Sequence, residues 1–518
     1  MQISEMSLEQ KIGQLFLVMI NGPVLSSEYK EHFMSTKIGN YILFAKDLTD
    51  YKSIRTLTDS LQDLAKTTCG IPAFISVDQE GGMVTRVFSG ATHFPSNMAI
   101  TASGEASSME QLGAMVGLEL RALGININHA PVLDVNNNPN NPIIGVRAYS
   151  DDPHVVAKMG VSYMKGLQKS GVIASGKHFP GHGDTTLDSH LGLPSIEHSM
   201  ERLKQVEFVP FSAAIRNGVD SFMTAHVSFK AIDNEVPATL SKKIIKGLLR
   251  QQLGFEGLII SDCMTMKAVK DAYTTEQSCV MALNAGIDLI CLNAPPDIQS
   301  KCIQAVQAAA IDGKLPLEVI DAAVERILRY KQKYQVGHVT TQPQETYPTH
   351  EALADKLSKK SITVTQGKEM LPITGQKFYI ISPPPVRTSI ADDTVTTMDP
   401  FCKQAAKEFG NMYSEITIDP NQEEITSIIN ATKDYDTVLY ACYSALVNSG
   451  QIQLYNALKA EGKKVILVSL RIPYDVMKMK DADCHIAAYE YTNRSVCNVI
   501  NVLAGKTKPE GTLPIKLH

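Results

Sequence analysis

The chain has 518 residues, of which 44% are hydrophobic and 20% are charged. This length predicts roughly two to four domains, and the composition is typical of a globular protein with a large core. The net charge of −5 excludes a strongly basic surface that would attract nucleic acid or anionic lipid. No apolar run is long enough to span a membrane. We therefore expect neither nucleic acid nor a membrane as a partner.

The nine cysteines are scattered, and none forms a Cys-x-x-Cys pair. Such a distribution is typical of reduced, buried thiols in a cytoplasmic protein. The first ten residues lack the cationic and apolar segments of a secretory signal. We therefore expect a cytoplasmic location, with a trimmed signal sequence as the alternative.

In the first 335 residues, short apolar runs of strand length alternate with amphipathic stretches of helical length. The helical patterns include 105–123, 153–169 and 200–217. Strand and helix repeated eight times predict a parallel (β/α)8 barrel of the TIM type. The expected strands are 14–20, 40–44, 72–78, 126–134, 172–177, 221–227, 257–262 and 286–292.

Polar side chains follow several of these runs at the point where each run ends. In such barrels the active site lies at the carboxyl ends of the strands. We therefore expect these side chains to converge on one pocket. They are Asp78, Asp134, Lys177 with His178, His226 and Asp262.

The rest of the chain predicts a second, smaller domain. After a helical stretch at 316–335, residues 336–350 are rich in Thr, Gln and Pro, which is typical of a linker. Apolar runs then alternate with helical patterns such as 423–432 and 454–461. The expected organisation is a catalytic barrel (1–335), a linker (336–350) and a C-terminal α/β sandwich domain (351–518) with a parallel or mixed sheet. Its expected strands are 378–382, 437–442, 464–469 and 486–488.

The densest polar segment is the loop from Lys177 to His190, which reads Lys-His-Phe-Pro-Gly-His-Gly-Asp-Thr-Thr-Leu-Asp-Ser-His. Its histidines and aspartates suit either a zinc or manganese site or proton transfer. Asp188 and His190 are two residues apart, so they point to the same side of an extended segment. The carboxylate then fixes the imidazole, whose other nitrogen serves as acid and base. A loop stiffened by its own hydrogen bonds stays an alternative.

In the segment 257–266, the carboxylate of Asp262 lies at the end of an expected apolar strand. An ionised aspartate at the catalytic face of a barrel is a suitable nucleophile for an anomeric carbon. An aspartate before a helix is equally typical of an N-cap. The residues of this segment leave both interpretations open.

Asp78 is followed by Gln-Glu-Gly-Gly and by Arg86, an arrangement that suits either the holding of sugar hydroxyls or a structural ion pair. Arg147 follows an Asn- and Pro-rich loop on the same expected face. The chain has no Trp, and this favours a small polar pocket for one terminal sugar over an aromatic cleft.

Together these segments resemble glycoside hydrolase family 3, and more narrowly its NagZ-type β-N-acetylglucosaminidases. The resemblance covers about residues 5–335 and extends to the α/β domain of the two-domain members. The motifs that carry it are Lys177-His-Phe-Pro-Gly-His-Gly-Asp184 with Asp188-Ser-His190, Asp78-Gln-Glu-Gly-Gly82, and Ser261-Asp262-x-Met-x-Met266.

The resemblance implies a role for each matching residue. Asp262 matches the nucleophile, His190 the general acid/base and Asp188 its partner. A His–Asp dyad thus replaces the usual acid/base carboxylate of glycosidases. His226 lies in a similarly typical segment without an assigned contact. The positions that hold the terminal sugar are matched by Asp78, Arg86, Arg147, Lys177 and His178.

The expected enzyme is an exo-acting, retaining β-N-acetylglucosaminidase that forms a covalent glycosyl-Asp262 intermediate and needs no metal or other cofactor. The resemblance implies a small carbohydrate substrate, an N-acetylglucosaminyl-muramic acid fragment of peptidoglycan, and hence a place in cell-wall recycling. Phosphate as acceptor in place of water is a secondary expectation, because a neutral imidazole repels an anion less than a carboxylate does.

Two rival functions remain at this stage. One is a metal-dependent barrel hydrolase that uses His178, His182, His190 and an aspartate. The other is a non-catalytic sugar- or muropeptide-binding protein, against which the intact nucleophile and dyad argue. The C-terminal domain shows no assignable motif, and no direct catalytic role is expected of it.

Overall fold

The computed structural model describes residues 3–387, 389, 391–393 and 398–517. Within this part of the chain, the first two thirds form a barrel of eight parallel strands. The strand order is β10-β1-β2-β3-β4-β5-β7-β9, and a parallel bridge between Ile260 and Leu289 joins the two outer strands. The strands are β1 (Phe16–Met19), β2 (Asn40–Ile42), β3 (Phe74–Val77), β4 (Ile127–Asn128), β5 (Ile173–Phe179), β7 (Ser221–Thr224), β9 (Leu258–Ile260) and β10 (Ile290–Leu292).

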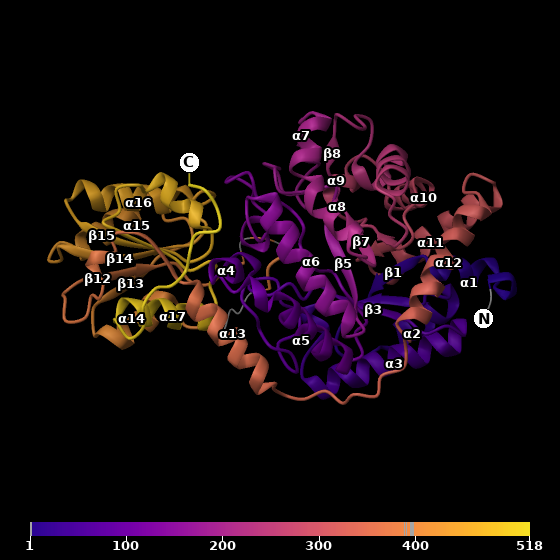
Figure 1. The fold of residues 1–518 in the computed structure, drawn as a ribbon, viewed down its shortest axis with the longest axis horizontal. Coiled ribbons are helices and arrows are strands. Elements are labelled where there is room, and N and C mark those ends of the chain that lie inside the picture. The colour runs from indigo at the N-terminus through magenta and orange to yellow at the C-terminus, as the bar shows by residue number, and fades with distance from the viewer. Residues whose placement is uncertain (1–2, 388, 390, 394–397, 518) are drawn as a thin grey trace.

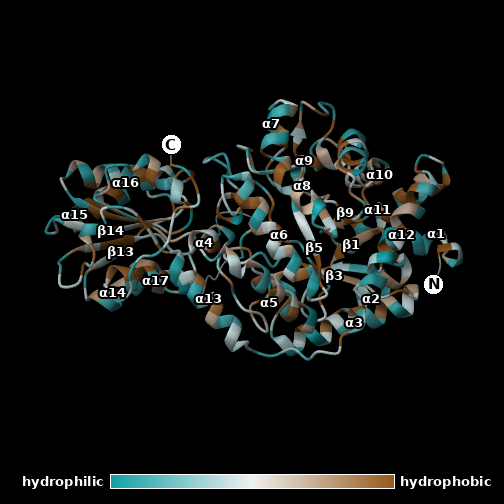
Figure 2. Cartoon of the chain, in the orientation of Figure 1, coloured by the Kyte–Doolittle hydropathy of each residue, from teal (hydrophilic) through white to brown (hydrophobic). Residues whose placement is uncertain are grey.

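Helices surround these strands, and the resulting barrel is seen in the right-hand part of Figure 1. Apolar residues gather on the strands and polar residues on the outer helices, as Figure 2 shows. The helices are α1 (Leu8–Gln14), α2 (Ser27–Thr36), α3 (Tyr51–Cys69), α4 (Asn97–Ala102), α5 (Met109–Ala122), α6 (Pro153–Lys169), α7 (Met200–Gln205), α8 (Phe208–Arg216), a π-helix (Lys243–Gln252), α9 (Lys267–Lys270), α10 (Thr275–Ala285), α11 (Pro296–Ile311) and α12 (Leu317–Lys333).

The expected barrel is confirmed, since each of the eight expected runs overlaps one observed strand. Most of the observed strands are shorter than their runs, but β5 extends past its run to Phe179. β4 ends at Asn128, three residues before Pro131, and proline offers no N–H to a ladder. The expected helix 200–217 is two helices, because the chain leaves helical geometry at Val206, with φ −129°. This break turns the carboxylate of Glu207 toward Asn137.

The second sheet lies at the left of Figure 1, in orange and yellow. Its order is β11-β16-β15-β14-β12-β13, and only the β11–β16 pair is antiparallel, so the sheet is mixed. Two of its strands lie outside the expected runs: β13 is an exposed edge strand and β11 is a half-buried one. The strands are β11 (Thr363–Gln366), β12 (Tyr379–Ser382), β13 (Tyr413–Glu415), β14 (Thr437–Cys442), β15 (Lys464–Ser469) and β16 (Cys484–Ala487). A separate two-stranded sheet pairs β6 (Ser195–Ile196) with β8 (Ser228–Phe229).

Alternate residues of β15 pack on opposite faces of this sheet, since Ile466 and Val468 join one apolar cluster and Val465 and Leu467 another. Helices α15 (Gln422–Ala431) and α16 (Ser449–Ala460) cover one face. Helices α14 (Phe401–Phe409) and α17 (Asn493–Leu503) cover the other (Figure 1). The result is the α/β sandwich expected from the sequence.

Residues 334–347, which contain no helix or strand, lead from α12 past the lower side of the barrel to α13 (Pro348–Ser361) (Figure 1). The last residues of the expected linker 336–350 thus form the first turn of α13, where Pro348 suits the first helical position. Ala354 and Leu357 of α13 belong to the apolar core of the barrel. Among the described residues no helix is long and apolar enough to cross a membrane.

Candidate active site

A cavity of about 330 Å³ opens at the carboxyl ends of the barrel strands. Ile42, Met223 and Cys291, which lie in three different strands, form part of its wall. Asp188 does not line it, and neither do Asp134 and His226, which were expected to converge on this pocket but lie buried behind its wall. The lining includes Asp78, Arg86, Arg147, Lys177, His178, His190 and Asp262.

Asp262 lies two residues after β9 and presents its carboxylate to the cavity. It does not cap a helix, because Met266 occupies the N-cap position of α9. The carboxylate instead accepts a hydrogen bond of 2.7 Å from the backbone N–H of Cys263. Burial acts to raise the pKa of Asp262, but the facing imidazoles of His226, His178 and His190 lower it below its usual value. Asp262 is therefore ionised at neutral pH, as a nucleophile requires.

His190 and Asp188 form the expected pair, with 2.7 Å between Nδ1 of His190 and Oδ1 of Asp188. The geometry differs from the extended segment expected from the sequence. The backbone N–H of His190 donates to the same oxygen and that of Leu191 to the carbonyl of Asp188, so the pair lies in a turn. Nδ1 faces Asp188, which leaves Nε2 of His190 for the cavity. His190 is partly exposed, and its side chain is 24% accessible.

The other histidines of the loop are held by hydrogen bonds within the protein. Nδ1 of His178 lies 2.7 Å from Asp134, which also accepts from the backbone N–H of His178 and of His182. The ring nitrogens of His182 lie 2.9 Å from the hydroxyls of Thr185 and Ser189. Burial and the nearby His178 lower the pKa of His182 to about 4, so its ring is neutral. Asp134 and His182 therefore fix the shape of the loop.

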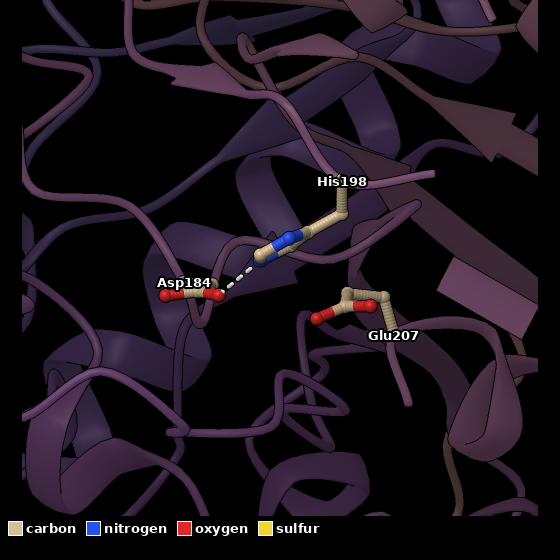
Figure 3. Close-up of side chains that lie close together, drawn as sticks. All are labelled: Asp184, His198 and Glu207. Carbon is tan, nitrogen blue, oxygen red and sulfur yellow. Dashed lines mark hydrogen bonds and ion pairs between the residues drawn. The ribbon is translucent and has the colours of Figure 1, made fainter. Parts of the chain in front are cut away.

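The metal set considered from the sequence, His178, His182 and His190 with an aspartate, is not assembled in this geometry. Within the described part of the chain, a different group has potential metal-ligand atoms within 4.8 Å of one another, namely Asp184, His198 and Glu207 (Figure 3). Nε2 of His198 lies 2.5 Å from Oδ2 of Asp184. This contact ties the loop to the segment before α7, and Glu207 is bonded to Asn137.

Four charged side chains form a network on the cavity wall, and their order is Asp78, Lys177, Glu80, Arg147. Nζ of Lys177 lies 2.6 Å from Asp78 and 2.7 Å from Glu80. Arg147 holds Glu80 through two hydrogen bonds of 2.8 and 2.9 Å. Burial opposes ionisation, yet Arg147 and Lys177 hold the pKa of Glu80 at about 2. All four groups are charged at neutral pH and present fixed donors and acceptors to the cavity.

Arg86 connects this network to the second sheet domain. Its Nη2 lies 3.8 Å from Oδ2 of Asp78, and its other end contacts Asp393 and donates to the carbonyl of Ala391 at 2.9 Å. Ala391 itself lines the cavity. No motif in the sequence predicts this approach, so the contribution of Ala391 to the cavity wall is a finding of the structure. Both interpretations of Arg86, sugar contact and structural ion pair, fit this position.

Three residues near the site were not assigned contacts from the sequence. Glu80 lies within the Asp78 motif but was not singled out. His226 lies beside the Asp262 segment: Nε2 donates to the carbonyl of Cys263 at 3.0 Å, and Nδ1 lies 2.9 Å from the hydroxyl of Thr239. His129, which follows β4, is fully buried near Asp78 and Asp262, and neither of its ring nitrogens has a hydrogen-bond partner.

Comparison with known proteins agrees with this geometry. Residues 7–330 match the N-terminal domain of glycosyl hydrolase family 3. β-Hexosaminidase A of Pseudoalteromonas piscicida is 30% identical, over 95% of this chain and 92% of its own length. A β-hexosaminidase of Neisseria meningitidis is 33% identical over 53% of this chain and 76% of its own length. The solved structure of a family 3 β-N-acetylglucosaminidase from a Paenibacillus species superposes with a TM-score of 0.91 at 35% identity, covering 99% of both chains. The chain therefore belongs to glycosyl hydrolase family 3 and is a glycoside hydrolase of the β-hexosaminidase type.

Proposed function

We propose that this protein is an exo-acting, retaining β-N-acetylglucosaminidase. The observation that carries the proposal is that Asp262, from the end of β9, and His190, from the loop after β5, line one cavity. The names of the relatives described above support N-acetylglucosamine as the sugar that is released. No metal enters the proposed reaction.

In the first step, the carboxylate of Asp262 attacks the anomeric carbon of the terminal sugar. The bond to the aglycone oxygen breaks as a covalent glycosyl-aspartate forms. The proton on Nε2 of His190 moves to the departing oxygen, while Asp188 steadies the imidazolium through Nδ1. The aglycone leaves as an alcohol, and His190 is left neutral.

In the second step, neutral His190 takes a proton from water as the water oxygen attacks the anomeric carbon. The bond to Asp262 breaks, and the sugar departs with the configuration it had in the substrate. The same imidazole thus acts as an acid and then as a base. Two inversions at one carbon account for net retention.

In this proposal the charged network of Asp78, Lys177, Glu80 and Arg147 holds the sugar and stabilises the transition state. Lys177 and Arg147 donate while Asp78 and Glu80 accept, and buried ion pairs fix all four before the substrate arrives. Donors and acceptors that need no reorganisation stabilise charge as it develops on the distorting ring. Strand residues such as Met223 and Cys291 form part of the wall toward the barrel core, which supports removal of terminal residues only.

For the natural substrate we propose a peptidoglycan fragment in which N-acetylglucosamine is joined to N-acetylmuramic or anhydromuramic acid. The loop from Lys177 to His190, which we call the catalytic loop, and the Asp262 segment both resemble those of NagZ-type enzymes. This resemblance supports the choice. It also supports a role in cell-wall recycling. The cytoplasmic location expected from the sequence stays a prediction.

A chromogenic assay tests the proposal directly. The protein should cleave 4-nitrophenyl β-N-acetylglucosaminide far faster than the matching β-glucoside, and proton NMR of the first product formed should show the β-anomer. Activity should survive EDTA. Absence of cleavage, an α-anomer as first product, or a loss in EDTA that zinc restores would each contradict the proposal.

A further inference from the structure

Three side chains that take no part in the reaction described above meet beside the catalytic loop. They are Asp184 of that loop, His198, which lies two residues after β6, and Glu207 at the break between α7 and α8. Their polar ends face a common space (Figure 3), and one ligand atom of each lies within 4.8 Å of the others. None of the three lines the catalytic cavity. The group is therefore separate from the site of the reaction.

The group contains two carboxylates with little positive charge to offset them. Glu207 is 3% accessible, and its ion pair is with Arg202, at 3.4 Å, whose side chain is 33% accessible. Asp184 meets the imidazole of His198 at 2.5 Å and has no other ion pair among the described residues. A buried carboxylate that is weakly neutralised is costly. A cation bound at this point would therefore stabilise the group.

A fourth polar side chain, Asn137, places an unused acceptor next to Glu207. Its amide nitrogen donates to the carboxylate of Glu207 at 3.0 Å. The oxygen of the same amide is buried and has no hydrogen-bond partner in the described part of the chain. Since most buried polar atoms are bonded, this oxygen is available to a ligand. It can accept from a water molecule on a metal ion or bind the ion itself.

The spacing of the three side chains suits a small divalent ion. Zinc binds imidazole nitrogen and carboxylate oxygen at about 2.0–2.2 Å in a tetrahedron, which places its ligand atoms roughly 3.4 Å apart. The observed separations run from 2.5 Å, between His198 and Asp184, to at most 4.8 Å. Small rotations of the side chains therefore bring all three to bonding distance. One imidazole with two carboxylates suits zinc or manganese, whereas magnesium and calcium prefer oxygen ligands alone.

A metal ion has access to this group from solvent. The side chains of His198 and Asp184 are 39% and 20% accessible, while Glu207 is the buried member. As the ion binds, the proton held between His198 and Asp184 is released to water, and bonds to the metal replace the hydrogen bond.

The three ligands come from parts of the chain that a bound ion would join. Asp184 precedes Asp188 of the catalytic dyad by four positions, and His198 and Glu207 lie on either side of α7. The loop already touches this helical break, because a Cβ atom on Gly181 would stand 3.1 Å from Cβ of Glu207. An ion at this point therefore fastens the loop to α7 and α8 without contact with the substrate.

We propose that Asp184, His198 and Glu207 form a structural site for a divalent transition metal, with zinc as the ion that fits best. Water completes the coordination, and Asn137 accepts a hydrogen bond from it. The bound ion stabilises the first part of the catalytic loop. In the metal-free protein the hydrogen bond between His198 and Asp184 holds the loop in place, so the activity expected in EDTA is unaffected.

Zinc binding to the untagged, full-length protein tests the site. After treatment with EDTA and removal of the chelator, titration calorimetry with zinc chloride should show one ion bound per chain. Zinc at about 100 times its dissociation constant should raise the folding equilibrium constant about a hundredfold, and hence the melting temperature. It should also slow proteolytic cleavage within the loop. Magnesium chloride should have little effect. A wild-type protein that binds no zinc would overturn the proposal.

Glu207→Gln removes one ligand and keeps the shape of the side chain. It should weaken zinc binding by at least about tenfold, since even the loss of a residue that only supports a ligand costs that much. His198→Ala should do the same. Glu201→Gln, an exposed glutamate of α7, is the matched control and should bind zinc as the wild type does. Circular dichroism of the metal-free variants checks that each is folded.

The same variants identify a different location of the ion. If zinc binds Glu207→Gln and His198→Ala as tightly as wild type, the site proposed here is wrong. If that zinc also inhibits cleavage of the chromogenic substrate, the ion lies at the histidines of the catalytic cavity instead. Failure of either test leaves the proposed hydrolase untouched, because that function is measured in EDTA.

Discussion

Asp262 is a buried carboxylate that stays ionised because imidazoles, rather than a cationic side chain, face it. His226, His178 and His190 lower its pKa against the effect of burial. A lysine or arginine at hydrogen-bond distance would hold the carboxylate in an ion pair and weaken it as a nucleophile. In this site the guanidinium and ammonium groups are instead paired with Asp78 and Glu80.

Removal of the Asp262 carboxylate should abolish turnover. We expect Asp262→Ala to lower kcat on 4-nitrophenyl β-N-acetylglucosaminide by roughly a thousandfold or more, the scale of losing a nucleophile. Asp271→Ala, an exposed aspartate just after α9, is the matched control and should keep wild-type activity. Wild-type rates in Asp262→Ala would rule out the covalent mechanism.

Replacement of His190 should show its role through the leaving group. Because kcat/KM reports the first step, His190→Ala should lower it roughly 10²- to 10⁴-fold for a disaccharide, whose alkoxide needs a proton. The loss should be much smaller for a 2,4-dinitrophenyl glycoside, which departs unaided. His154→Ala, an exposed histidine at the start of α6, serves as the control. Equal losses on both substrates would contradict general acid catalysis.

At this scale the sequence predicted much of the site. Most of the expected residues line the cavity, and the three that do not, Asp188, Asp134 and His226, bond to residues that do. The sequence could not show that Asp188 and His190 meet through a turn, since their spacing fits an extended segment equally well. Nor could it show that Glu80 joins Lys177 to Arg147, because those three residues lie far apart in the chain.

At the scale of elements, close contact with the segment after β4 positions the catalytic loop. Gly183 lies so near this segment that a Cβ atom would stand 1.7 Å from the carbonyl oxygen of Val135. Asp134, the neighbour of Val135, bonds to His178 and His182 of the same loop. Backbone packing and side-chain bonds thus fix one shape for the part of the loop that precedes Asp188.

Gly183→Ala should therefore displace the loop. We expect the free energy of unfolding to fall by about 1–3 kcal/mol, as for other overpacked sites, and kcat/KM to fall with it because His190 no longer reaches the sugar. Gly247→Ala in the π-helix is the matched control, since its Cβ would meet only a carbonyl 3.9 Å away. Chemical denaturation and the chromogenic assay measure the two effects. Unchanged activity in a stable Gly183→Ala would show that the loop tolerates displacement.

The strands of the barrel were predictable because buried parallel strands are continuous apolar runs. β1 and β9 are such runs, since they read Phe-Leu-Val-Met and Leu-Ile-Ile. The edge strand β13 was not predictable, since Tyr413–Glu415 is largely exposed and carries no apolar run. The division of 200–217 into α7 and α8 was not predictable either. Both halves are amphipathic, so together they resemble one continuous helix.

At the scale of the whole molecule, the barrel and the second sheet domain meet through buried polar contacts. Glu490, which follows β16, accepts a hydrogen bond of 2.6 Å from the backbone N–H of Ser96 at the N-cap of α4. Burial raises the pKa of Glu490 to about 7 despite this bond. The carboxyl group is therefore neutral in mildly acidic solution and charged above neutrality.

The raised pKa of Glu490 predicts that the folded protein becomes less stable in alkaline solution, because the buried carboxyl group must then carry a charge. The folded protein holds this proton more tightly than the unfolded chain, whose pKa is about 4.5. The stabilisation is therefore complete below pH 4.5 and is lost as the pH rises through about 7. Its full size is on the order of a few kcal/mol.

We expect Glu490→Gln, which removes the charge and keeps the shape, to raise the melting temperature relative to wild type at pH 8.5. At pH 5 the two proteins should melt alike. Differential scanning calorimetry at both values checks this. A difference of the same size at both pH values would exclude titration of Glu490 as the cause.

The contacts between the two parts of the molecule could not be predicted from the sequence. Arg86 meets Asp393 across more than 300 positions of the chain, and Asp393 belongs to no local pattern. The sequence predicted a linker and a second domain but assigned that domain no part in the site. Ala391 instead reaches the cavity wall beside Arg86.

Because of Arg86, the barrel depends on the second sheet domain for a neutralising carboxylate. A barrel inherited or excised alone would keep a largely buried guanidinium at its mouth and lose the carboxylate that neutralises it. Recombination that exchanged the C-terminal half for a distant relative's would leave the same charge facing a foreign surface. A chimaera of two such proteins should thus be active only when it keeps a matching pair of residues at positions 86 and 393.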